Sequence, residues 1–152
     1  MSSKKKSSVD PKQVVAFLAH PRYAVVGASQ DRTKYGNKCL RCYLQHDRAV
    51  TPVNPKAMAI EGVACVASLS QLPEPRSEVA VSVVTPPHVT MRVMDDAAQA
   101  GIKYLWLQPG SESSAVLDRA KQLGLTVISR QCVLTVLGFD PLYFPPSQNS
   151  KL

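Results

Sequence analysis

The sequence lacks any long hydrophobic run. Although 45% of its 152 residues are hydrophobic, polar residues interrupt every apolar stretch before the roughly 18 residues that a membrane-spanning helix requires. The first ten residues, MSSKKKSSVD, contain three lysines but no apolar segment after them, so they do not resemble a secretory signal. We therefore expect a cytoplasmic protein with no membrane contact and with enough residues to bury one hydrophobic core.

Cysteine and histidine are also scarce. The cysteines are Cys39, Cys42, Cys65 and Cys132, and without a signal sequence we expect them to be reduced thiols. Cys39 and Cys42 form a C-x-x-C pair, but it lies inside a helical pattern and no second pair completes a zinc site. The three histidines show no metal-ligand or catalytic-triad arrangement. These shortages favour a binding protein over an enzyme and predict no metal site, while leaving catalysis open.

Acidic residues are outnumbered by basic ones, 11 against 18, which gives a formal net charge of +7. Lys4, Lys5 and Lys6 belong to a serine-rich and lysine-rich stretch, so we expect residues 1–9 to be a disordered tail and the rest to carry about +4. Aromatic residues make up only 6% of the chain and are not interleaved with the basic ones, which does not fit a nucleic-acid-binding surface. An anionic small molecule fits this charge better.

What the sequence does contain is a regular alternation of short apolar runs and helical patterns. Runs rich in β-branched and aromatic residues predict strands at 23–28, 49–54, 79–85, 103–108 and 125–129. Helical patterns occupy 11–19, 37–46, 89–100 and 113–123. This alternation predicts a three-layer α/β fold over residues 10–140, with five parallel strands in the order 3-2-1-4-5 and helices on both faces. Residues 141–152 are expected to form a proline-rich tail.

The loop after the first predicted strand has the features of a phosphate-binding loop. Gly27 ends the strand and allows a ligand to approach the backbone closely, while Ser29 offers a hydroxyl. The N–H groups at the start of the next helix favour an anion. The loop is not the dinucleotide fingerprint G-x-G-x-x-G, because Ser29 and Arg32 stand where its second and third glycines belong and Gly36 comes late.

The loop after the second predicted strand supplies a cation. An NAD-dependent enzyme usually has an acidic residue here to bind the ribose hydroxyls, whereas this chain reads PVNPK and places Lys56 near that position. A cation favours a phosphorylated ribose, and both coenzyme A and NADP contain one. The residues alone therefore leave two hypotheses open, a coenzyme A-binding module and an NADP-type oxidoreductase or redox sensor.

Several spaced motifs together resemble one family. In order, VVGAS, KYG, PVNPK, SLSQLPEP, VTPPHVT and LWLQPGSES resemble the CoA-binding domain family of small stand-alone Rossmann-like proteins, which are similar to the CoA-binding domain of the succinyl-CoA synthetase α subunit. The resemblance extends from about residue 14 to about residue 138. It implies a Rossmann-like fold that binds coenzyme A or an acyl-CoA as carrier, sensor or regulator, and it leaves a protein partner or a homo-oligomer open.

The resemblance also implies the ligand-binding residues. These are Gly27, Ala28, Ser29, Lys34 and Tyr35 in the first loop, Asn54 and Lys56 in the second, Thr85, Pro86 and Pro87 in the third, Gln108, Pro109 and Gly110 in the fourth, and Cys132 after the fifth strand. Lys56 is expected to face the phosphates of the ADP portion. After the fifth strand the chain reads SRQCVL, and only Cys132 matches the family there, so the pantetheine end is the least defined. Ligase activity is not expected, because synthetase chemistry needs a phosphorylated histidine from a further domain.

Overall fold

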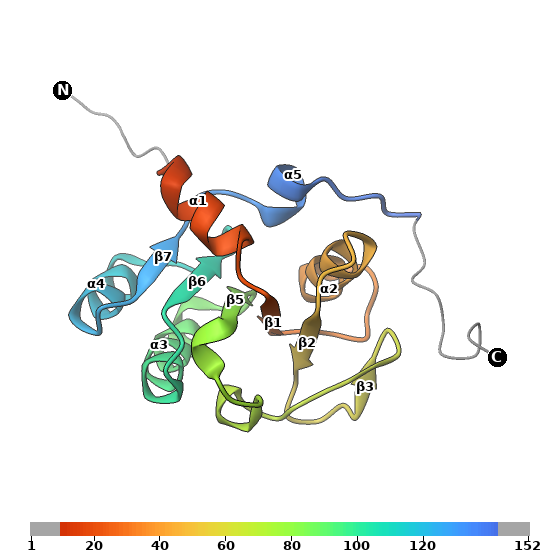
Figure 1. The fold of residues 1–152 in the computed structure, drawn as a ribbon, viewed down its shortest axis with the longest axis horizontal. Coiled ribbons are helices and arrows are strands. Elements are labelled where there is room, and N and C mark those ends of the chain that lie inside the picture. The colour runs from red at the N-terminus through yellow and green to blue at the C-terminus, as the bar shows by residue number, and fades with distance from the viewer. Residues whose placement is uncertain (1–9, 143–152) are drawn as a thin grey trace.

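A central parallel sheet organises the molecule. The computed structural model describes residues 10–142 (Figure 1). Five strands form the sheet: β1 (Arg22–Val26), β2 (Val50–Val53), β5 (Val79–Val83), β6 (Tyr104–Leu107) and β7 (Thr126–Ile128). All neighbouring strands in it run parallel, and a separate antiparallel hairpin joins β3 (Ala59–Ile60) to β4 (Val63–Ala64). The predicted parallel α/β fold is therefore confirmed.

Helices cover both faces of the sheet, as predicted. They are α1 (Pro11–Leu18), α2 (Tyr35–Gln45), α3 (Pro87–Ala100), α4 (Ser114–Gln122) and α5 (Val133–Leu137), with short 3-10 helices η2 (Leu69–Gln71) and η3 (Arg76–Glu78). Figure 1 shows α1, α2 and α5 on one side and α3 and α4 on the other. Each side has its own buried core, the first around Phe17 and Trp106 and the second around Met94 and Leu105. Within residues 10–142, no helix combines the length and the apolar character that crossing a bilayer requires.

The order of the strands differs from the prediction. Counted along the chain, the five parallel strands lie in the order 2-1-3-4-5 and not 3-2-1-4-5, because β5 pairs with β1. The outer edge of β2 is occupied by the chain around Val66, which forms a parallel bridge with Val53 and donates its N–H to the Pro52 carbonyl. The β2–β5 connection also contains no α-helix. The strand order therefore reverses between β1 and β5, and this is where doubly wound sheets bind ligands.

The helices predicted from periodicity are all present, and each end lies within two residues of the prediction. Gly101 ends α3 with a φ of 84°, in the left-handed conformation that favours glycine. The β3–β4 hairpin and α5 were not predicted, because elements of two to five residues are too short to show a period. The expected tail at 1–9 and most of the expected tail at 141–152 lie outside the described residues.

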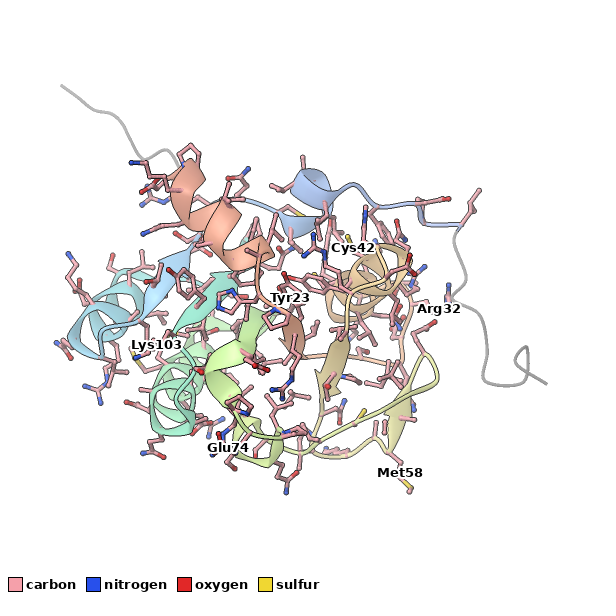
Figure 2. The ribbon with its side chains drawn as sticks, viewed as in Figure 1. Tyr23, Arg32, Cys42, Met58, Glu74 and Lys103 are labelled. Carbon is pink, nitrogen blue, oxygen red and sulfur yellow. The ribbon has the colours of Figure 1, made fainter. Side chains whose placement is uncertain are left out.

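Side chains confirm the separation of core and surface. Tyr23 lies within the molecule, where its ring stacks on Tyr43 at a centroid distance of 4.9 Å (Figure 2). Met58 projects from the loop before β3 and is 89% exposed. The connection between β2 and β5 is thus a surface segment with few buried side chains of its own.

Candidate functional site

Two glycines fix the shape of the loop after β1. Gly27 has a φ of 90°, and a Cβ there would overlap the carbonyl oxygen of Val84 and lie 2.9 Å from its carbonyl carbon. A Cβ on Gly36, in the first turn of α2, would overlap the Gly27 carbonyl oxygen in the same way. Gly27 is therefore required by both its backbone conformation and its neighbour, and Gly36 allows α2 to contact the loop directly. Gly36 comes later in the sequence than the last glycine of the dinucleotide fingerprint, because this loop is wider and α2 still contacts it closely.

Two asparagine amides orient the peptide groups of this loop. Asn54 Nδ2 donates to the Ala28 carbonyl at 2.9 Å, and Asn37 Nδ2 donates to the Ser29 carbonyl at 2.9 Å. Because the N–H of a trans peptide points opposite to its C=O, the N–H groups of Ser29 and Gln30 point away from these amides. Successive backbone N–H groups oriented by a turn are a common way to bind an anion. Asn37 was not among the predicted site residues.

The loop after β2 forms a hollow with the first loop. Asn54 Oδ1 accepts hydrogen bonds from the N–H groups of Lys56 at 2.7 Å and Ala57 at 2.9 Å, which fixes a tight turn. The exposed Lys56 lines a hollow of about 320 Å³ together with Ser29, Gln30, Asp31, Asn54 and Ala57. The structure thus brings the predicted cation and the predicted phosphate loop to one place, and Asn54 positions both.

One carboxylate shares this hollow. Asp31 accepts hydrogen bonds from the Thr33 hydroxyl at 2.7 Å and the Thr33 N–H at 2.9 Å. These bonds to Thr33 lower the pKa of the Asp31 carboxyl. The N–H of Asp31 donates to Ser29 Oγ at 3.0 Å, so the hydroxyl of Ser29 also stabilises the turn.

A larger cleft lies beside the hollow and shares Asn54 with it. Its volume of about 530 Å³ falls within the usual range for small-molecule sites. Its walls come from the ends of β1 and β2, the segment before η2, the loop after β5 and one face of α3. Apolar walls include Val26, Val53, Leu69, Val89 and Val93, and polar groups come from Asn54, Ser68, Thr85, Arg92, Asp95 and Asp96.

The α3 wall carries charges that the sequence analysis did not assign to the site. Arg92 and Asp96 are exposed. Asp95 forms an ion pair with Arg119 of α4 at 2.6 Å. Arg92 follows closely after the VTPPHVT motif, and this was the feature of the sequence that could have identified it. A helix that begins at the sheet edge presents one face to the crevice. Arg119 neutralises Asp95 and the cation of Arg92 lies on the same wall, so this end of the cleft carries both signs of charge and offers Asp96 as a hydrogen-bond acceptor.

The loop after β5 is tied to the loop after β6 through Ser111. The Thr85 N–H donates to Ser111 Oγ at 3.1 Å, and Ser111 Oγ donates to the Val83 carbonyl at 3.1 Å. The Thr85 and Thr90 hydroxyl oxygens lie 2.7 Å apart. Thr85 lines the cleft, whereas Ser111 was not among the predicted site residues, because a serine after a glycine resembles an ordinary turn residue.

Gln108 and Cys132 interact with each other and do not line either the cleft or the hollow. Gln108 is 2% exposed. Its Nε2 donates to Cys132 Sγ at 3.2 Å, and its Oε1 accepts the Val133 N–H at 2.8 Å. Gln108 thus holds the start of α5, and both the nitrogen and the oxygen of its amide already have a partner within the protein.

The predicted residues therefore divide into two sets. Those around the cleft and hollow are Gly27, Ala28, Ser29, Asn54, Lys56 and Thr85. Those outside these walls are Lys34, Tyr35, Pro86, Pro87, Gln108, Pro109, Gly110 and Cys132. Pro86 and Pro87 begin α3, and Lys34 precedes α2, whose first turn has no side-chain cap.

Cys39 and Cys42 are buried, whereas Cys65, like Cys132, is half-buried. Cys42 lies beneath the segment after α5 and donates to the Gly138 carbonyl at 3.5 Å (Figure 2). Burial raises the pKa of the Cys42 thiol to about 12, and burial also raises the pKa of the Cys39 thiol. Within residues 10–142, no three His, Cys, Asp or Glu side chains are grouped in a way that suits a metal ion.

A glycine-shaped loop at the reversal point of a parallel sheet, with a cation and an apolar cleft beside it, defines the class of doubly wound nucleotide-binding domains. The sequence profile of the CoA binding domain matches residues 21–138. The chain belongs to this CoA-binding domain family, which confirms the resemblance seen in the sequence.

Solved structures agree with this assignment. A conserved hypothetical protein from Pyrococcus furiosus is 36% identical, with 76% of this chain and 97% of that chain covered and a TM-score of 0.71. A hypothetical protein from Pyrococcus horikoshii OT3 shares the fold at a TM-score of 0.78 and 24% identity, over 89% of this chain and 95% of that chain. An acetyl-coenzyme A synthetase from Ca. Korarchaeum cryptofilum is 27% identical over 70% of this chain and 25% of that chain, with a TM-score of 0.60.

Proposed function

We propose that this protein binds coenzyme A or an acyl-CoA without transforming it, as a carrier, sensor or regulator. The observation that carries the proposal is the cation-containing hollow that adjoins an apolar cleft of about 530 Å³ at the reversal point of the sheet. Membership of the CoA-binding domain family supports coenzyme A as the ligand. An acetyl-coenzyme A synthetase among the similar structures is consistent with that ligand.

The residues that line the hollow and the cleft indicate which part of the ligand each of them binds. Phosphate groups bind in the hollow, where Lys56 and the N–H groups of Ser29 and Gln30 provide positive charge and hydrogen-bond donors. The uncharged base of the nucleotide binds in the cleft, where apolar side chains form the walls and Asp96 accepts hydrogen bonds. Asp31 also lines the hollow, so the phosphate groups lie on the side of Lys56 and these N–H groups, away from its carboxylate.

Lys56 provides the most direct test of this arrangement. Lys56→Ala removes a charge-assisted contact worth about 1.5–3 kcal/mol, which corresponds to about 10-fold to 150-fold in affinity. If Lys56 binds the 3′-phosphate, calorimetric titration shows this loss for coenzyme A and a much smaller one for dephospho-CoA. Lys121→Ala, an exposed lysine on α4, is the matched control and leaves both affinities unchanged.

Two results would count against this role for Lys56. An equal loss for both ligands shows that Lys56 does not read the 3′-phosphate. No loss for either ligand shows that Lys56 contacts no phosphate group of the ligand.

A further inference from the structure

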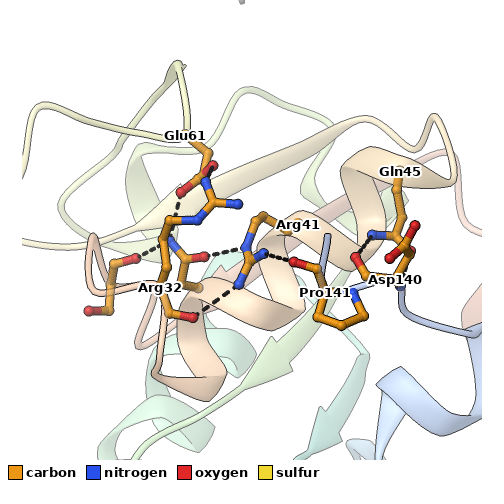
Figure 3. A network of polar contacts seen from close by, with 8 residues as sticks. Arg32, Arg41, Gln45, Glu61, Asp140 and Pro141 are labelled. Atoms are coloured by element: carbon orange, nitrogen blue, oxygen red, sulfur yellow. Dashed lines mark hydrogen bonds and ion pairs between the residues drawn. The ribbon is translucent and has the colours of Figure 1, made fainter. Parts of the chain in front are cut away.

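A buried arginine connects the phosphate-binding loop to the end of the described chain. Arg41, in the middle of α2, is only 3% exposed. Its guanidinium donates to Asn37 Oδ1 at 2.6 Å, the Arg32 carbonyl at 3.0 Å and the Pro141 carbonyl at 3.2 Å (Figure 3). It also lies 5.2 Å from the centroid of the Phe139 ring. Burying a guanidinium is costly unless its N–H groups are paired, so Arg41 requires these partners in place.

On one side, the partners of Arg41 hold the phosphate-binding loop. Asn37 links Arg41 to the Ser29 carbonyl, and it also donates to Glu61 Oε2 at 3.0 Å. Glu61 in turn forms an ion pair with Arg32 at 2.7 Å. Two carbonyls of the loop, those of Ser29 and Arg32, are therefore held by one connected group of side chains (Figure 3).

On the other side, residues 138–142, here called the C-terminal segment, lie along α2. The Gly138 carbonyl accepts from His46 Nε2 at 2.7 Å. Asp140 forms two backbone hydrogen bonds with the Gln45 side chain, at 2.7 Å to Oε1 and at 3.3 Å from Nε2. These contacts place the Pro141 carbonyl at Arg41.

We propose that docking of the C-terminal segment regulates the affinity of the phosphate-binding loop, with Arg41 as the positioning residue that couples them. When the segment undocks, Arg41 loses the Pro141 carbonyl and the Phe139 ring, and water then competes for the N–H groups that hold the Arg32 carbonyl. A ligand that requires the ordered loop binds the docked form more tightly. Coupling is reciprocal, so ligand binding must also stabilise the docked segment. This inference rests on the proposed binding of coenzyme A.

The first test weakens docking without touching the loop. Gln45→Ala removes both hydrogen bonds to Asp140 and leaves Arg41, Asn37 and Glu61 intact. We expect the affinity for coenzyme A to fall by at least about fivefold, the lower end of typical coupling between sites. Gln99→Ala, an exposed glutamine on α3, is the matched control and leaves the affinity unchanged.

The second test measures the reciprocal effect. Hydrogen exchange of the Asp140 N–H, which is bonded to Gln45 Oε1, slows by at least about fivefold when coenzyme A saturates the wild-type protein. A side chain that only supports the fold would not transmit ligand binding to this amide. In Arg41→Met, coenzyme A no longer slows the exchange of the Asp140 N–H. If Arg41→Met does not fold, Phe139→Ala takes its place, because it removes only the ring beside Arg41.

The outcomes separate the two proposals. The proposed coupling is wrong if the wild-type protein binds coenzyme A and Gln45→Ala binds it equally well. It is also wrong if coenzyme A does not change the hydrogen exchange rate of the Asp140 N–H. In either case the proposed function stands. If the wild-type protein does not bind coenzyme A, both proposals are overturned.

Discussion

Gly36→Ala is the substitution for which the structure predicts a result opposite to helix propensity. In a helix interior alanine is more favourable than glycine by about 1 kcal/mol, and because Gly36 is the second residue of α2, propensity alone predicts a gain of at most this size. The added Cβ, however, would overlap the Gly27 carbonyl oxygen and lie 2.9 Å from its carbonyl carbon and 3.2 Å from Ala28 Cα. All three are backbone atoms, so no side-chain rotation relieves the overlap.

The clash outweighs the gain in propensity. Overpacking costs about 1–3 kcal/mol, and here it requires α2 to move away from the loop until carbon contacts reach about 3.5 Å. We expect a net loss of about 1–2 kcal/mol, which lowers the melting temperature by about 2–8 °C for a chain of this size. Coenzyme A affinity falls as well, because Gly27 and Ala28 belong to the proposed phosphate-binding loop. Thermal denaturation followed by circular dichroism and calorimetric titration measure the two effects.

Gly101→Ala provides the control for this prediction. No atom lies within 4 Å of its added Cβ, but its φ of 84° is unfavourable for alanine. This variant loses stability through backbone strain alone and retains the ligand affinity of the wild type. If Gly36→Ala melts at or above the wild-type temperature and binds coenzyme A normally, the reasoning about the loop is refuted.

Two further predictions concern an amide and the thiols. Asn54→Ala leaves the Ala28 carbonyl without its amide donor and removes the acceptor of two N–H groups. We therefore expect the free energy of unfolding, measured by urea denaturation, to fall by about 1–3 kcal/mol, and coenzyme A to bind more weakly. Unchanged values for both would contradict this prediction. At pH 8, labelling with a thiol reagent followed by mass spectrometry should modify the half-buried Cys132 well before Cys39 and Cys42, whose burial raises the pKa of each thiol; equal rates at the three sites would refute this order.

The fold class could be predicted because the patterns that indicate it lie within short stretches of the sequence. Alternating apolar runs and helical patterns are readable without knowing which segments meet, and each predicted strand and helix is present. Strand order depends on a pairing between distant segments. The bridge between Val53 and Val66 occupies the outer edge of β2, and nothing in the residues around Val66 distinguishes it from a loop.

The site could be predicted only in part for the same reason. Gly27, Ser29 and Lys56 were predicted because each lies in a loop directly after a strand, and the structure places them around the cleft and the hollow. Gln108 stands in an equivalent position, yet its amide is occupied by Cys132 and Val133. Arg41 resembles a solvated helix residue in the sequence, and only the packing of α2 against the C-terminal segment buries it.

Calorimetric titration of the wild-type protein with coenzyme A, NADPH and NADH shows which nucleotide the protein binds. Each ligand carries an ADP portion, and the proposed contact of Lys56 with a phosphorylated ribose could be made by either coenzyme A or NADPH. We expect saturable binding of coenzyme A at one site per chain, with NADPH and NADH at least about tenfold weaker, a difference of about 1.4 kcal/mol. Tighter binding of NADPH or NADH, or no heat of binding with coenzyme A, would contradict this expectation.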